Sequence, residues 1–201
     1  IDRTGLQSIV FLSGLPGAGT TTALTNIALT LAATDRRVVV VDGNFRRPRI
    51  APLFGASDDQ PGLGDLLAGS ASVDDVVGVD EAGLSYITAG RPGSRIIERL
   101  GTEHLDRVVA ELRSRYDVIL FDAPPAVVAG DAMLLANRLD GAVLVVRANQ
   151  EHRGLVARLL HQIHDTQAEL LGVVLNRPRG TVGGYFKKNF ETMAKYAEKP
   201  S

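Results

Sequence analysis

The sequence contains no cysteine, carries almost no net charge and has no long hydrophobic run. Without cysteine, the chain forms no disulfide, offers no thiolate to a metal and has no cysteine nucleophile. A formal net charge of −1 gives no general attraction to nucleic acid, so we expect no nucleic-acid partner. No apolar stretch approaches the roughly 20 residues of a membrane-spanning helix, and no signal peptide opens the chain. Since the first residue is Ile1 rather than Met, we expect a fragment whose upstream part could hold a membrane anchor.

Hydrophobic residues make up 45% of the 201 positions, which is enough for a sizeable core in one domain. Short apolar runs at 8–12 and 38–41 flank a segment, 21–33, whose apolar residues recur with helical spacing. This order is typical of a strand, a crossover helix and a parallel strand. We expect further strands at 84–88, 117–121, 141–146 and 171–175. The helical pattern of 94–115 breaks near Gly101, where Thr102 is expected to cap the second part.

A glycine-rich loop follows the first predicted strand. Gly14 and Gly19 are separated by four residues and followed by Thr20 and Thr21. Backbone N–H groups of such a loop, together with the N-terminus of the next helix, bind phosphate. The spacing matches a P-loop except that Thr20 stands where a P-loop has Lys. The residues predicted to bind the nucleotide phosphates are Gly14, Pro16, Gly17, Ala18, Gly19, Thr20, Thr21 and Thr22.

Carboxylates end two other predicted strands, Asp42 at the second and Asp122 at the 117–121 strand. Ligands of open parallel sheets bind at these C-terminal strand ends. The hydroxyl of Thr21 and the carboxylates of Asp42 and Asp122 are therefore predicted to hold Mg²⁺, and both carboxylates are candidate catalytic residues. Asp131 has two open interpretations, one that it orients Mg²⁺ or water and one that it caps its own helix.

These patterns predict an α/β fold of three layers, doubly wound around a mostly parallel sheet and P-loop NTPase-like. We place this domain at 1–178 and a partly flexible C-terminal tail at 179–201. Asn176 and Arg177 follow the last predicted strand, and a resemblance to the wider class of P-loop ATPases implies that Asn176 contacts adenine. A simple turn is the other interpretation of these two residues.

Five segments resemble the motifs of bacterial protein-tyrosine kinases, which belong to the deviant P-loop ATPase class. They are 42–48, similar to D-x-D-x-R-x-P, 116–125, similar to Y-D-x-h-h-h-D-x-P-P, 131–132, 140–147 and 172–176. The resemblance covers about residues 8–177. It implies ATP or ADP and Mg²⁺ as ligands, and Tyr185 and Tyr196 of the tail as phosphate acceptors between subunits of a homo-oligomeric ring.

The resemblance also implies a setting. Such domains lie at the cytoplasmic face of the inner or plasma membrane and serve exopolysaccharide or capsule biosynthesis and export. The implied partner is a membrane protein that sets polysaccharide chain length, or an upstream membrane segment of the same chain.

The sequence departs from the family pattern at Thr20, which lacks the charge of the P-loop Lys, and at Asn44, which replaces the second carboxylate of D-x-D. Losing one charge-assisted phosphate contact costs about 1.5–3 kcal/mol. We therefore expect a catalytically weakened domain or a pseudokinase. An active autokinase that phosphorylates its own tail is the alternative. A partitioning-type positioning ATPase is a weaker one, because those proteins carry a second Lys where this chain has Leu15.

Two arginines after the second strand are candidates to replace the missing Lys. Arg46 and Arg47 both reach a phosphate if their loop bends inward, whereas the other interpretation of Arg46 is a salt bridge or a subunit contact. The sequence leaves these alternatives open.

Overall fold

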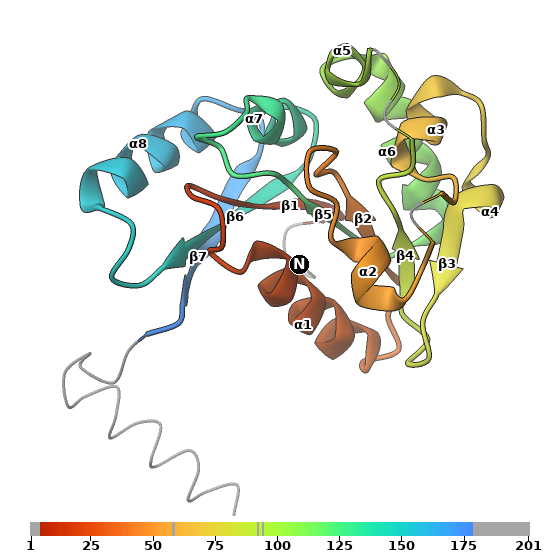
Figure 1. Ribbon diagram of the computed structural model, residues 1–201, viewed down its shortest axis with the longest axis horizontal. Helices are drawn as coiled ribbons and strands as arrows, with labels where there is room; N and C mark the ends of the chain where they lie inside the picture. Colours follow the sequence, from red (N-terminus) through yellow and green to blue (C-terminus); the bar gives the residue numbers. More distant parts are fainter. Residues whose placement is uncertain (1–4, 58, 92, 94, 179–201) are drawn as a thin grey trace, which may run out of the picture.

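A computed structural model describes residues 5–57, 59–91, 93 and 95–178. Within these ranges the chain forms one seven-stranded sheet with the order β3-β4-β2-β5-β1-β6-β7 (Figure 1). The strands are β1 (Ser8–Ser13), β2 (Val38–Asp42), β3 (Val77–Val79), β4 (Ser85–Ile87), β5 (Val118–Asp122), β6 (Gly141–Arg147) and β7 (Glu169–Asn176). The helices are α1 (Thr20–Ala32), α2 (Ile50–Phe54), α3 (Leu63–Ala68), α4 (Val73–Val76), α5 (Ile96–Leu100), α6 (Glu103–Arg115), α7 (Asp131–Ala136) and α8 (Arg153–His164).

All strand pairs are parallel except β3–β4, which confirms the predicted mostly parallel sheet. The pairing of β2 with β5 sets Asp42 directly opposite Asp122. The pairing of β1 with β5 sets Phe11 opposite Asp122, just before the glycine-rich loop leaves the sheet. The three segments predicted to form the site therefore lie at one edge of the sheet.

Helices cover both faces of the sheet (Figure 1). Val10 and Leu12 of β1 point into a core shared with α3 to α8, whereas Ile9 and Phe11 point into a core shared with α1 and α2. The central strands are buried on both faces, which explains why they read as continuous apolar runs rather than as alternating ones.

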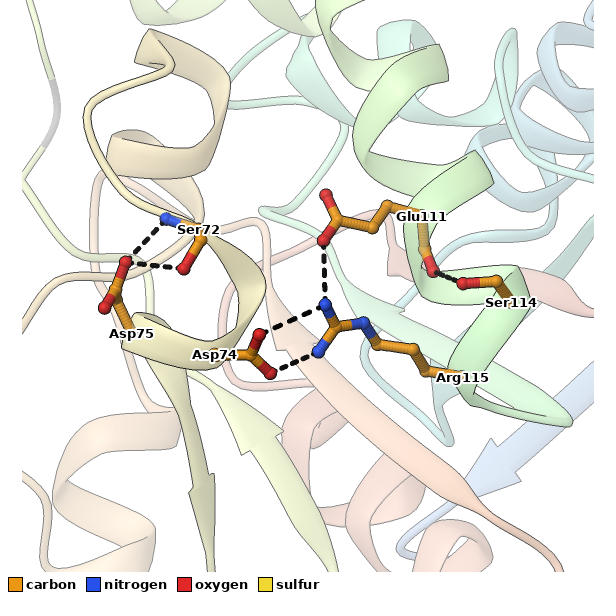
Figure 2. Close-up of polar contacts among 6 residues, drawn as sticks. All are labelled: Ser72, Asp74, Asp75, Glu111, Ser114 and Arg115. Carbon is orange, nitrogen blue, oxygen red and sulfur yellow. Dashed lines mark hydrogen bonds and ion pairs between the residues drawn. The ribbon is translucent and has the colours of Figure 1, made fainter.

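Charged side chains form an ion pair between the small helix α4 and α6. Figure 2 shows the Arg115 guanidinium between the carboxylates of Asp74 and Glu111, and the contact to Glu111 measures 3.1 Å. Asp75 accepts hydrogen bonds from the backbone N–H and the hydroxyl of Ser72, at 2.8 and 2.6 Å, and so closes the start of α4. The contact between Asp74 and Arg115 thus links α4, which leads into the antiparallel strand β3, to α6.

Thr102 occupies the expected cap position of α6, but its hydroxyl donates to the carbonyl of Arg99 and not to a backbone N–H of the helix. Asp131 is the first residue of α7, whose cap position is Gly130, so the capping interpretation of Asp131 is wrong. Its other interpretation, that it orients Mg²⁺ or water, stays a prediction. Among the described residues, no helix combines the length and the apolar character required to cross a membrane.

Candidate nucleotide site

The glycine-rich loop turns sharply between β1 and α1. Gly17 and Gly19 have φ angles of 78° and 89°, a conformation that favours glycine. A Cβ on Gly19 would lie 2.2 Å from Nδ2 of Asn176, so the position has no room for a side chain. That Asn176 amide donates to the carbonyl of Ala18 at 2.8 Å, and its oxygen accepts from the backbone of Arg177. In this structure Asn176 holds the loop, and its predicted contact with adenine stays a prediction.

The second threonine after Gly19 pairs with the acidic residue at the end of β5. The Thr21 hydroxyl donates to Oδ2 of Asp122 at 2.5 Å. The other carboxylate oxygen, Oδ1, is buried and has no hydrogen-bond partner in the part of the chain that the structure describes. The pKa of Asp122 is raised to about 7, mainly because the carboxyl group is buried. The Thr21 hydrogen bond lowers the pKa and the nearby charge of Asp42 raises it, and both effects are included in that value.

This pair fits a magnesium ion. A buried carboxylate oxygen without a partner and an adjacent hydroxyl are the hard oxygen ligands that Mg²⁺ takes from proteins. No group of three or more acidic or histidine side chains is arranged for a metal within the described ranges. Mg²⁺ bound here would therefore complete its coordination with phosphate oxygens and water, as it does at nucleotide sites.

Asp42 is fully buried, and its carboxylate is occupied by its own loop. Oδ1 accepts from the backbone N–H of Asn44 at 3.0 Å, and Oδ2 accepts from those of Arg49 and Ile50 at 2.8 and 2.9 Å. Burial raises the pKa of Asp42 by more than these three hydrogen bonds lower it. The geometry shows that Asp42 shapes the 43–49 loop, so a direct catalytic or metal-binding role for it stays a prediction.

The two arginines considered from the sequence differ in their surroundings. Arg46 forms an ion pair with Asp131, Nε to Oδ2 3.2 Å, in which the Asp131 side chain is 3% exposed. Arg46 therefore makes the salt bridge that was one of its two interpretations. Arg47 instead lines a cavity of about 420 Å³ above the glycine-rich loop.

The cavity brings together residues 16–22, Asp122 and the 43–49 loop. Gly14, Asp42, Asn176 and Arg177 do not line it. The cavity is also lined by Arg49, and by Pro52 and Leu53 of α2, which were not predicted from the sequence. The path of the 43–50 loop brings these residues to the cavity, and no spacing in the sequence indicates that path.

Glu151 is a second contact that the sequence did not reveal. Its carboxylate accepts from the backbone N–H groups of Arg147 and Leu15, and burial raises its pKa more than these bonds lower it. A Cβ on Gly14 would come within 3.0 Å of this carboxylate and 2.9 Å of Leu159. Gly14 thus lets the loop lie directly against α8. The predicted tail with Tyr185 and Tyr196 lies outside the described residues.

Comparisons with known proteins show which family the chain resembles. Tyrosine-protein kinase YwqD of Bacillus subtilis is 27% identical over 177 residues, which span 88% of this chain and 74% of YwqD. Putative tyrosine-protein kinase EpsB of Ralstonia solanacearum is 32% identical over 184 residues, which span 87% of this chain and 24% of EpsB. The crystal structure of the VpsO kinase domain matches with a TM-score of 0.82 and 35% identity, over 88% of this chain and 87% of that one. This chain belongs to the bacterial tyrosine-protein kinases.

These matches confirm the resemblance drawn from residues 42–48 and 116–125. No protein-family model matches this kinase-family chain. It spans about three quarters of YwqD but about a quarter of EpsB. A more distant solved structure shares the fold of this kinase-family domain. It is cobyrinic acid a,c-diamide synthase of Mycobacterium smegmatis with an ATP analogue and magnesium. The TM-score is 0.73 at 20% identity, over 97% of this chain and 84% of that one.

Proposed function

We propose that this domain binds ATP or ADP with Mg²⁺ and that its phosphoryl transfer is weakened. We place it in a bacterial tyrosine-kinase system for exopolysaccharide or capsule biosynthesis. The observation that carries the proposal is the unpartnered Oδ1 of Asp122, beside the Thr21 hydroxyl and inside the cavity above the loop. A buried carboxylate left in this state is stabilised by a cation.

Each residue then has a part in holding the nucleotide. The backbone of residues 16–20 and the N-terminus of α1 bind the phosphates. Thr21 and Asp122 hold the ion, and Asp42 keeps the neighbouring loop in place. Asn176 lies beside the loop, and we expect Asn176 and Arg177 to contact the adenine. Bound Mg²⁺ would neutralise charge on the phosphate oxygens during transfer.

Thr20 is the reason to expect weakened transfer. Its short neutral side chain is 9% exposed at the first position of α1 and supplies no positive charge. The missing contact costs about 1.5–3 kcal/mol, equivalent to roughly 10- to 150-fold in affinity. The loss in the chemical step is larger wherever negative charge develops during transfer.

Isothermal titration of ADP and ATP, with and without Mg²⁺, tests the proposal. We expect the parent protein to bind in the micromolar range and Thr20→Lys to bind about 10- to 150-fold more tightly. Thr30→Lys, which adds the same charge at an exposed position of α1, is the matched control and should bind like the parent. Asp122→Asn should remove the Mg²⁺ dependence. Absence of binding by both the parent and Thr20→Lys would rule out the site.

The retained Thr21–Asp122 pair also supports a second candidate, an active autokinase. In that reaction the γ-phosphoryl group of ATP passes to the hydroxyl of Tyr185 or Tyr196, and ADP and a proton are released. Mass spectrometry after incubation with Mg·ATP should then find phosphate on one of these tyrosines in the parent and none in Asp122→Asn. Unmodified tyrosines in the parent would leave the scaffold role of a pseudokinase.

We also propose that the domain works at the cytoplasmic face of the membrane as a homo-oligomer, beside a membrane polysaccharide chain-length protein or a membrane segment of its own chain. The lengths of the relatives support both arrangements, since the chain spans most of YwqD but a small part of EpsB. Fractionation of cells that express the complete native protein tests this. Recovery with the membranes is expected, and recovery in the soluble fraction when the chain-length protein is present would contradict it.

A further inference from the structure

The phosphate-binding loop lacks a cation of its own, but two guanidinium groups line the same cavity. Arg47 and Arg49 belong to the segment between β2 and α2, while Thr20 lies at the start of α1. Asp122 is the acidic residue among the described residues that line the cavity. The cavity therefore combines the phosphate loop, one acid and two arginines from a different segment.

The segment that carries these arginines is held at both ends. Asp42 accepts the backbone N–H groups of Arg49 and Ile50, and Ile50 is fully buried at the start of α2. The ring of Phe54, at the end of α2, stacks on Tyr86 with centroids 4.8 Å apart. These contacts fix the backbone from which Arg49 extends.

The ion pair between Arg46 and Asp131 fixes the other side of the segment, because Asp131 lies on α7, across the loop. It also takes Arg46 away from the cavity and leaves the next residue, Arg47, to line it. Neither Arg47 nor Arg49 forms an ion pair with a carboxylate in the part of the chain that the structure describes. Both side chains are exposed and free to turn toward an anion.

We propose that Arg47 and Arg49 supply, from the loop after β2, the positive charge on the nucleotide phosphates that Thr20 does not. The ligand class is a nucleoside di- or triphosphate, since the guanidinium fork pairs with two phosphate oxygens at once. This inference rests on the proposed function. Under this inference the positive charge of the site comes from a segment outside the P-loop. The two arginines then offset part of the phosphate binding that is lost with the loop Lys.

The test is a double-mutant cycle measured by titration of ADP with Mg²⁺. The variants are Arg47→Gln/Arg49→Gln, Thr20→Lys, and the triple combination. The matched control, Arg107→Gln/Arg158→Gln, removes the same charge from exposed positions of α6 and α8. Thermal melts check that each variant is folded, and Arg47→Lys/Arg49→Lys tests whether charge alone restores binding. Titration of pyrophosphate and of adenosine separates phosphate contacts from base contacts.

We expect Arg47→Gln/Arg49→Gln to weaken ADP and pyrophosphate at least about 10-fold, to leave adenosine unchanged, and to have a smaller effect once Lys is present at position 20. The control should change ADP binding by less than about threefold. If the parent binds ADP and the double variant binds equally well, the inference is wrong and the proposed function stands. If the parent binds no nucleotide while Thr20→Lys does, the arginines do not compensate, and the inference and nucleotide binding by the native chain both fail.

Discussion

Asp122 is placed where ionisation is costly unless a cation lies beside it. The residue is 1% exposed, and one of its oxygens has no partner among the described residues. Burial raises its pKa to about 7, even though the Thr21 hydroxyl donates to the other oxygen. Mg²⁺ at this position would favour the ionised form and offset the cost of burial. Under the proposed function, the same residue destabilises the metal-free fold and would bind the ion in the nucleotide-bound one.

Replacing Asp122 should change how the stability of the metal-free protein depends on pH. A folded pKa near 7 against an unfolded value of 3.8 means that the carboxyl group favours folding fully below pH 3.8, and that this contribution is lost as the pH rises to about 7. Asp122→Asn removes this titration, so its stability relative to the parent should rise between pH 4 and pH 8 by roughly 4 kcal/mol. Urea melts in EDTA at several pH values measure this difference, and a difference that does not vary with pH would contradict the assignment.

Gly19 should tolerate no side chain, for two separable reasons. Alanine there would carry the strain of a φ near 89° and would also place its Cβ 2.2 Å from the Asn176 amide. We expect Gly19→Ala to destabilise the fold by about 1–3 kcal/mol. Adding Asn176→Ala should relieve the contact but not the backbone strain, so part of the loss should remain. Thermal melts of the two single variants and the double variant measure this. If the double variant were as stable as Asn176→Ala alone, the backbone strain would be absent.

The sequence predicted the central elements well because each carries a strong local signal. The apolar runs that became β1, β2 and β5 are buried on both faces, and the helical spacing at 21–33 became α1. The short strand β3, Val77–Val79, was not predicted, because its residues are half-exposed and it begins directly after α4. The side chains of Thr102 and Asp131 bond to Arg99 and Arg46, and the sequence did not settle these partners because the contacts depend on packing.

The candidate site was predictable as far as its parts are continuous in sequence. The glycine spacing and the strand ends pointed to residues 16–22 and Asp122, which the structure brings into one cavity. Arg49 and Glu151 were not predicted, because their places depend on the path of the 43–50 loop and on the packing of α8 against Gly14. Contacts between such distant segments leave no periodic pattern in a single sequence.

Asp140 joins three elements at the opposite edge of the sheet. Its carboxylate accepts from the backbone of Gln7 and Ser8 at the start of β1 and from Arg113 of α6 at 2.6 Å, just before β6 begins. Burial raises its pKa, but the bonds from Ser8 and Gln7 and the Arg113 charge outweigh burial, so the pKa of Asp140 is lowered. This cluster joins β1, which leads into the glycine-rich loop, to β6, which ends at Arg147.

Removing the Asp140 charge should loosen that alignment. We expect Asp140→Asn to lower the free energy of unfolding by about 1–3 kcal/mol at pH 7. Because the folded pKa is lowered, the advantage of the parent is present above the unfolded value of 3.8 and should shrink as the pH falls below it. Urea melts at pH 7 and pH 3 measure the change. Asp165→Asn, whose side chain is 80% exposed, is the control and should behave like the parent at both pH values.

The candidate nucleotide cavity is lined by segments that are far apart in the chain, namely the loop after β1, the 43–49 segment and the end of β5. β1 lies between β5 and β6 in the sheet, so the glycine-rich loop leaves from near the centre of the fold. A ligand bound there holds three segments together at once. Binding should therefore stabilise the fold as a unit, rather than only the loop.

We accordingly expect Mg·ADP to raise the melting temperature of the parent. At a free concentration 100 times Kd the stabilisation is about 2.7 kcal/mol, which for a domain of this size is about 5–10 °C. Thr20→Lys should show a larger shift at the same ADP concentration, because tighter binding increases the ratio of ligand to Kd. EDTA should remove most of the shift in the parent but leave Asp122→Asn nearly unchanged, since that variant has already lost its metal ligand. An equal, Mg²⁺-dependent shift in Asp122→Asn would place the ion away from Thr21 and Asp122.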